Sequence, residues 1–139
     1  MVENRDYKRA LLKSTVDYYK RIISIFQEQY PDLAYPEIIV FSVDLNSFLK
    51  RAENQEWPVA ATWLVEKIDA LARAGADFAV ISSNTPHIVF DEVQAQSPIP
   101  LLSIVEETCR KAEHLDVKTL GLMGTKFTME ADFYQKSFQ

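Results

Sequence analysis

The sequence is poor in the residues that build the commonest nucleotide and metal sites. Its 139 residues include three glycines, two histidines and one cysteine. These three glycines, Gly75, Gly121 and Gly124, do not match the spacing of a glycine-rich dinucleotide loop or of a Walker loop. The single Cys109 excludes an internal disulfide, and with two histidines it gives no zinc-ligand spacing. The composition therefore disfavours a nucleotide enzyme and predicts no metal site.

The chain also lacks an excess of positive charge and any long apolar run. Its formal net charge is −5 at pH 7, and its Lys and Arg residues are spread along the sequence. Such a protein is not expected to bind nucleic acid. No run approaches the roughly 18 apolar residues of a membrane span, and the first thirteen residues are too polar for a signal peptide. We therefore expect a cytoplasmic protein without a membrane partner, and a single domain over residues 1–139.

Helix-like and strand-like segments alternate along the chain. An apolar face at helical spacing, from Leu12 to Tyr30, predicts a long helix over residues 5–30 that ends at Pro31. Strands are predicted near 38–43, 78–82, 101–102 and 119–123, and the first of them is expected to be buried on both faces. The predicted later helices run from Pro58 to a left-handed cap at Gly75, over 86–97, over 103–115 and towards Phe138. This alternation predicts an α/β fold with a parallel sheet and helices on both faces.

The order of these segments is unusual, because the chain opens with a helix and not with a strand. Residues 3–8 are too charged to form a buried strand. The helix face would then lack part of its packing surface, at about 1.5–3 kcal/mol for each large side chain left exposed. We expect marginal stability or reliance on another chain.

Polar side chains follow each predicted strand. Since the carboxyl ends of parallel strands meet at one edge of the sheet, these residues are expected to converge on a ligand site. The set consists of Ser42, Asp44, Ser83, Asn84, Thr85, Ser103, Thr125 and Thr128. Residues 83–85 also precede a helix start at Pro86, where free N–H groups attract anions. The sequence therefore predicts that Ser83, Asn84 and Thr85 hold an anionic small molecule.

Helix capping is the competing explanation for each of these residues, since a Ser, Thr, Asp or Asn cap contributes about 1 kcal/mol without any ligand. Ser103 and Glu106 have the spacing of a capping box, which favours capping for Ser103. Thr128 is predicted to cap the last helix. For Asp44, and for Asn84 and Thr85, the two explanations are equally good.

Two further residues, His87 and Cys109, have reactive side chains, but a structural role is the better explanation for each. His87 could orient a ligand or shuttle a proton, but a histidine bonded to nearby backbone is the more frequent case. Cys109 falls mid-helix, close to Ala112, and is predicted to be a buried core thiol.

The run 81–87, Ile-Ser-Ser-Asn-Thr-Pro-His, resembles the Cys-Asn-Thr-x-His segment of the aspartate/glutamate racemase family. Segments 14–19, 41–44, 74–78 and 121–129 are similar to other parts of the family in the same order. The resemblance implies an α/β fold of two similar halves and racemisation of amino acids without pyridoxal phosphate or another cofactor. It implies two thiols on opposite faces of the substrate's α-carbon, one removing the proton and the other returning it.

The resemblance places Ser83 at the position of the first catalytic cysteine. It makes Asn84, Thr85 and Thr125, with Ser42 and Thr128, the expected substrate-binding residues, and it implies pairing as a homodimer. The family's opening strand and its second Gly-Cys-Thr segment have no counterpart in the sequence. We therefore expect an incomplete aspartate- or glutamate-type racemase with impaired proton transfer. The alternative is a non-catalytic module that binds an amino acid or a dicarboxylate.

Overall fold

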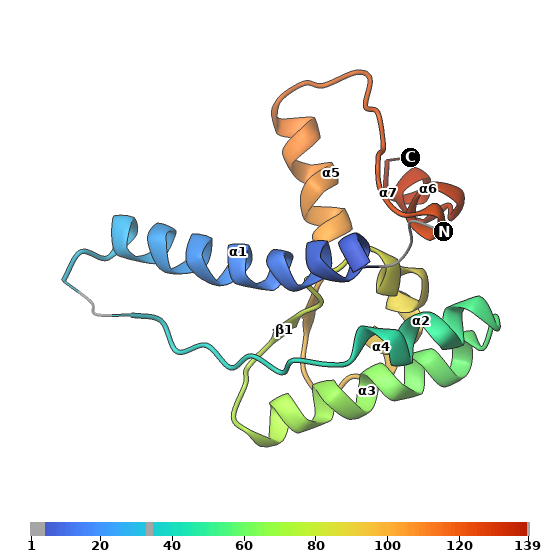
Figure 1. Ribbon diagram of the computed structural model, residues 1–139. Helices are drawn as coiled ribbons and strands as arrows, with labels where there is room; N and C mark the ends of the chain where they lie inside the picture. The colour runs from blue at the N-terminus through green and yellow to red at the C-terminus, as the bar shows by residue number, and fades with distance from the viewer. Residues whose placement is uncertain (1–4, 33–34, 139) are drawn as a thin grey trace. The chain divides into compact units, whose positions relative to one another are not determined.

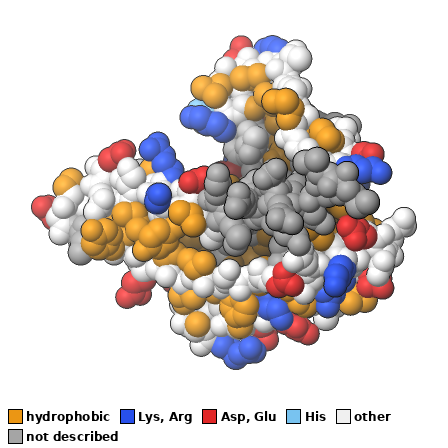
Figure 2. Space-filling model, viewed as in Figure 1, with side chains coloured by type: hydrophobic (Ala, Val, Ile, Leu, Met, Phe, Trp, Pro, Cys, Tyr) orange, Lys and Arg blue, Asp and Glu red, His pale blue; other side chains and the backbone are white. Residues whose placement is uncertain are grey.

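The computed structural model describes residues 5–32 and 35–138 and divides into two compact units, with the boundary after Ile38. The first unit contains one long helix, α1 (Arg5–Gln29), which confirms the predicted helix before Pro31. Hydrophobic side chains are visible on the surface of this helix (Figure 2), and Val16 and Tyr19 are 50% and 44% exposed. Leu12 of the predicted apolar face lies outside the described side chains. In the described part of the first unit, no strand accompanies this helix.

The second unit alternates helices with two short strands (Figure 1). β1 and β2 pair in parallel, with Ala79 opposite Leu101 and Val80 opposite Leu102. The α/β fold with a parallel sheet is thus confirmed, and the prediction of a single domain stays a prediction. In order, the elements are α2 (Leu45–Glu53), α3 (Trp57–Arg73), β1 (Ala79–Val80), the 3-10 helix η1 (Thr85–Val89), α4 (Phe90–Gln96), β2 (Leu101–Leu102), α5 (Ile104–His114), α6 (Lys126–Glu130) and α7 (Phe133–Ser137).

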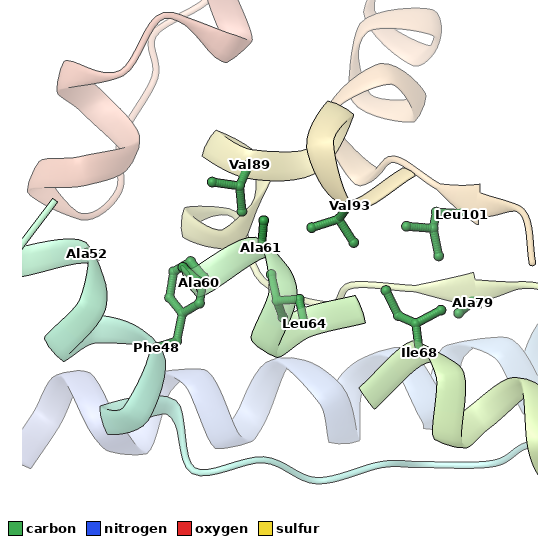
Figure 3. Packing of buried hydrophobic residues seen from close by; sticks show 10 residues of the cluster. All are labelled: Phe48, Ala52, Ala60, Ala61, Leu64, Ile68, Ala79, Val89, Val93 and Leu101. Atoms are coloured by element: carbon green, nitrogen blue, oxygen red, sulfur yellow. The ribbon is translucent and has the colours of Figure 1, made fainter. Parts of the chain in front are cut away.

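The core of the second unit lies where α2, α3 and α4 meet the two strands (Figure 3). Phe48 of α2 and Val93 of α4 are its most completely buried large side chains. Burying a side chain of this kind stabilises the fold by roughly 1.5–3 kcal/mol. The full cluster consists of Phe48, Ala52, Ala60, Ala61, Leu64, Ile68, Ala79, Val89, Val93 and Leu101.

Several helix boundaries follow from local chemistry. Pro58 occupies the first turn of α3, and Gly75 follows its end with a φ of 97°, as the sequence predicts. The Ser103 side chain accepts a hydrogen bond from the Glu106 N–H at 3.2 Å and caps α5. Asp44 caps α2 in the same way, accepting from the Asn46 N–H at 3.1 Å. Sequence analysis missed α2, although Asp44 was its signal.

The prediction of a buried strand over 38–43 is wrong. The segment is irregular, and Ile39, Val40 and Phe41 are each about half exposed. A parallel strand is buried only when neighbouring strands pair with it and helices cover it. In the second unit as described, β1 and β2 pair only with each other, so this segment has no ladder partner.

The prediction of a strand over 119–123 is wrong for the same reason, since Leu120 is 52% exposed and no ladder forms there. The strand predicted over 78–82 is shortened to β1, with Phe78 exposed. The helix predicted over 86–97 begins as η1 and continues as α4. The last predicted helix is divided into α6 and α7, because Ala131 has an extended backbone. No helix in the described parts of the chain has the length and apolarity needed to cross a membrane.

Candidate functional site

The loop that leaves the carboxyl end of β1 carries Ser83, Asn84 and Thr85, as predicted. Pro86 lies in the first turn of η1, where its fixed φ suits the start of a helix and its missing N–H costs no hydrogen bond. The Asn84 carbonyl accepts a hydrogen bond from the His87 N–H at 2.9 Å. This turn fixes the backbone that presents the three polar side chains.

Three threonine hydroxyls from two distant segments form a largely buried cluster, which we call the threonine cluster. The hydroxyl oxygens of Thr85 and Thr125 lie 3.3 Å apart, and those of Thr125 and Thr128 lie 3.0 Å apart. Thr85 and Thr128 are almost completely buried, with 2% and 0% of their surface exposed. Residues far apart in the sequence therefore meet at this point, as expected for a site built from several loops.

The cap of α6 is Thr125 and not Thr128, which corrects the sequence prediction. The Thr125 hydroxyl accepts from the Thr128 N–H at 3.0 Å. The two candidates are three residues apart, so either hydroxyl fits a cap pattern in the sequence, but only Thr125 has the extended backbone of an N-cap residue. Gly124 allows this packing, since a Cβ there would lie 3.1 Å from the Thr128 methyl carbon.

Asn84 is held by a residue that sequence analysis did not assign to the site. The Tyr134 hydroxyl of α7 donates to the Asn84 Oδ1 atom at 2.9 Å. In the sequence, Tyr134 lies within the helix predicted to run towards Phe138, and no site role was predicted for it. The feature of the sequence that could have suggested this contact is the phenol hydroxyl itself, since a packed tyrosine usually finds a hydrogen-bond partner for it.

His87 is bonded to backbone, as the sequence predicts. Its Nδ1 atom lies 2.8 Å from the Ser83 carbonyl oxygen and donates to it, and its ring stacks on Phe90 at a centroid distance of 5.0 Å. The side chain is 4% exposed, and this burial lowers its pKa below the usual 6.5 despite the carbonyls of Ser83 and Asn84. The imidazole is therefore neutral at pH 7, with Nδ1 carrying the proton.

The Ser83 hydroxyl is buried and has no hydrogen-bond partner among the described residues, and the same is true of the His87 Nε2 atom. Native proteins rarely leave such groups unpaired, because each costs about 1–3 kcal/mol. His87 bonds the carbonyl of Ser83 and not its hydroxyl. The hydroxyl thus has unused hydrogen-bonding capacity, but no base in the described chain activates it.

The predicted convergence of all strand-end residues is only partly observed. Ser103 and Asp44 are engaged as helix caps, and Ser42 is exposed on the irregular segment before α2. The hydrogen bonds of the described residues do not link these three to the threonine cluster. For Ser42 and Asp44 the reason is the missing ladder, since a segment outside the sheet does not bring its carboxyl end to the sheet edge. Ser103 does follow a paired strand, β2, but its hydroxyl caps α5.

Two other kinds of chemical group in the described part of the chain are the thiol and the potential metal ligands. Cys109 is buried in α5 at 4% exposure, as predicted, and burial raises the pKa of its thiol, with the charges of Glu113 and Glu106 adding to the effect. Among the described residues, no group of three or more His, Cys, Asp or Glu side chains could hold a metal ion.

Comparison with known proteins gives consistent matches to racemases. The broad specificity amino-acid racemase RacX of Bacillus subtilis is 28% identical over 127 residues, covering 89% of this chain and 55% of that protein. The crystal structure of an aspartate racemase homologue from Pyrococcus horikoshii OT3 superposes with a TM-score of 0.77 at 37% identity, covering 91% of this chain and 55% of that one. A putative Asp/Glu racemase from Yersinia pestis gives a TM-score of 0.81 at 33% identity, with 90% and 54% coverage.

The chain spans about half the length of these relatives. The family model for Asp/Glu/hydantoin racemases matches residues 12–139, which include every element of the candidate site. The chain therefore belongs to the Asp/Glu/hydantoin racemase family.

Proposed function

We propose that this chain binds an aspartate- or glutamate-type amino acid and takes part in the cofactor-independent interconversion of its L and D forms. The observation that carries the proposal is the contact between the Thr85 and Thr125 hydroxyls, which joins the loop that bears the buried, unpaired Ser83 hydroxyl to a second segment with hydroxyl donors. Family membership supports the reaction class.

The binding roles follow from what each side chain can donate. The Asn84 carboxamide and the Thr85 and Thr125 hydroxyls supply hydrogen bonds to a substrate carboxylate. Thr128 is completely buried and bonded to Thr125, so it acts by holding Thr125 in place. Ser42 stays a predicted substrate-binding residue that no contact supports.

Racemisation needs one group to remove the α-proton and another to deliver a proton to the opposite face. Ser83 occupies the position of the first of these groups, but an uncharged hydroxyl without a base is a poor proton acceptor at neutral pH. The only thiol of the sequence, Cys109, is buried in α5. We therefore propose that this 139-residue chain by itself has no appreciable racemase activity.

The test is exchange of the α-proton of L- and D-aspartate in deuterated water, followed by NMR. We expect very slow exchange with the wild-type chain, and faster exchange with Ser83→Cys, because a thiolate is a far better base. Ser137→Cys, which places a thiol on exposed α7, is the matched control and should not accelerate exchange. Steady turnover of L-aspartate to D-aspartate by the wild-type chain would refute the predicted loss of activity.

Binding must be measured beside exchange. Saturable binding of aspartate with no exchange in any variant, including Ser83→Cys, would identify a binding module and contradict the proposed reaction. Absence of binding would contradict the proposed site itself.

Location and assembly complete the proposal. We propose a cytoplasmic protein that does not bind nucleic acid and that pairs as a homodimer. Light scattering on the purified chain tests the pairing, and a monomer at all concentrations would exclude it.

A further inference from the structure

The Tyr134 hydroxyl contacts the candidate site through a hydrogen bond to the Asn84 side chain, 50 residues away. We propose that Tyr134 is a positioning residue that fixes the orientation of the Asn84 carboxamide, so that its N–H donors face the ligand and the site selects carboxylates over carboxamides. This inference rests on the proposed function.

An asparagine side chain has little intrinsic preference between the two orientations of its carboxamide. The Asn84 backbone is fixed, since it has helical φ and ψ of −70° and −48° and its carbonyl accepts from the His87 N–H. The terminal torsion of an asparagine side chain is broad and nearly two-fold, so a rotation of about 180° exchanges its oxygen and nitrogen at little cost. The orientation of the carboxamide must therefore be determined by a contact with another residue.

The hydrogen bond from the Tyr134 hydroxyl determines this orientation. The hydroxyl donates at 2.9 Å to Oδ1, the only acceptor atom of the carboxamide, and so directs the two N–H donors away from the ring. The reversed orientation would require the phenol oxygen to accept from the amide. A phenol is a weaker acceptor than donor, because its lone pair is delocalised into the ring. The observed orientation is therefore the favoured one.

The C-terminal segment 125–134 contacts two adjacent residues of the loop after β1. Thr125 contacts Thr85 through their hydroxyls, and Tyr134 contacts Asn84. The first contact joins groups that can both donate and accept, so it specifies no ligand. The second fixes a donor and leaves a carboxylate, which only accepts, as the preferred ligand.

The experiment compares wild type, Tyr134→Phe and Tyr35→Phe, the last being the same change at an exposed tyrosine. First, the Asn84 13Cγ resonance is recorded without ligand. Loss of the phenol donor should move it upfield in Tyr134→Phe and leave it unchanged in Tyr35→Phe. An unchanged resonance in Tyr134→Phe would overturn the inference.

Second, the dissociation constants of L-aspartate and of its diamide are measured for the three proteins. The ratio of the two affinities should fall about tenfold in Tyr134→Phe, the factor that one hydrogen bond to a charged group contributes. A structural role alone would weaken both ligands equally, so an unchanged ratio would overturn the inference while leaving the proposed function intact. A wild-type chain that does not bind aspartate would overturn the proposed function, and the selectivity with it.

Discussion

The Thr125 hydroxyl lies 3.3 Å from that of Thr85 and also caps α6. One side chain thus starts a helix and joins that helix to the loop after β1. This double role connects the stability of the C-terminal segment to the geometry of the site.

Removing the Thr125 hydroxyl should destabilise the protein. We expect Thr125→Ala to lower the free energy of unfolding by about 1–2 kcal/mol, through loss of the cap and of the bond to Thr85. Thr125→Ser keeps the hydroxyl and should recover most of the lost free energy of unfolding. Urea unfolding measures this free energy for the two variants. Thr108→Ala, which removes an exposed hydroxyl bonded within α5, should change the free energy by no more than about 0.5 kcal/mol, and an equal loss in the two alanine variants would contradict the double role.

Stability should fall as the pH is lowered through 6.5 because of His87. Its folded-state pKa lies below the usual value, so the unfolded chain binds more protons and is favoured as the pH falls. The stability that comes from keeping His87 neutral is fully present above pH 6.5, and it is lost as the pH falls towards the lower pKa of His87 in the folded protein. Thermal melts at about pH 7.5 and 5.5 should show a smaller difference in His87→Gln than in wild type. The same change at exposed His114 is the control, and an equal pH effect in the two variants would contradict the assignment to His87.

The features that could be predicted from the sequence are those decided by a few neighbouring residues. Pro31 and Gly75 follow the ends of their helices, and Ser103 begins one, because each acts on the backbone next to it. The loop after β1 was placed correctly for the same reason. Family resemblance then assigned its residues to a substrate, which composition alone could not do.

The features that could not be predicted depend on what packs against a segment. The run 38–43 has the composition of a buried strand, but without a ladder partner in the described second unit it is irregular and exposed. The contact between Asn84 and Tyr134 joins residues 50 positions apart, and no local pattern specifies such a pair. The choice between Thr125 and Thr128 as cap was decided by backbone angles that either threonine could adopt.

Gly75 should be the most sensitive of the tested glycines to substitution. Its φ of 97° is disfavoured for residues with a Cβ, although nothing lies within 4 Å of the added atom. Gly75→Ala should therefore cost about 1–2 kcal/mol through backbone strain alone. Gly121→Ala is the matched control, because it also meets no atom within 4 Å and its φ lies outside the left-handed range. Equal urea midpoints for the two variants would contradict the strain argument.

The core shown in Figure 3 predicts that the loss of stability caused by a Val→Ala substitution depends strongly on where the valine lies. Val93 is completely buried, whereas Val59 of α3 is 52% exposed. Val93→Ala should lower the free energy of unfolding by about 2 kcal/mol, since it removes buried carbon atoms and leaves a cavity. Val59→Ala should change it little. Similar losses in the two variants would show that α4 does not pack against this cluster.

Cys109 should be inert in the folded protein, and this bears on the proposed chemistry. The thiolate is the reactive form, and burial together with the charges of Glu113 and Glu106 raises the thiol pKa. Iodoacetamide at about pH 7.5 should modify the native chain slowly and the urea-unfolded chain rapidly. A Cys109→Ser, Ser137→Cys variant supplies an exposed thiol and should react rapidly when folded. Equally rapid native labelling of Cys109 would make it a candidate for proton transfer, because a thiolate that meets iodoacetamide is also available as a base.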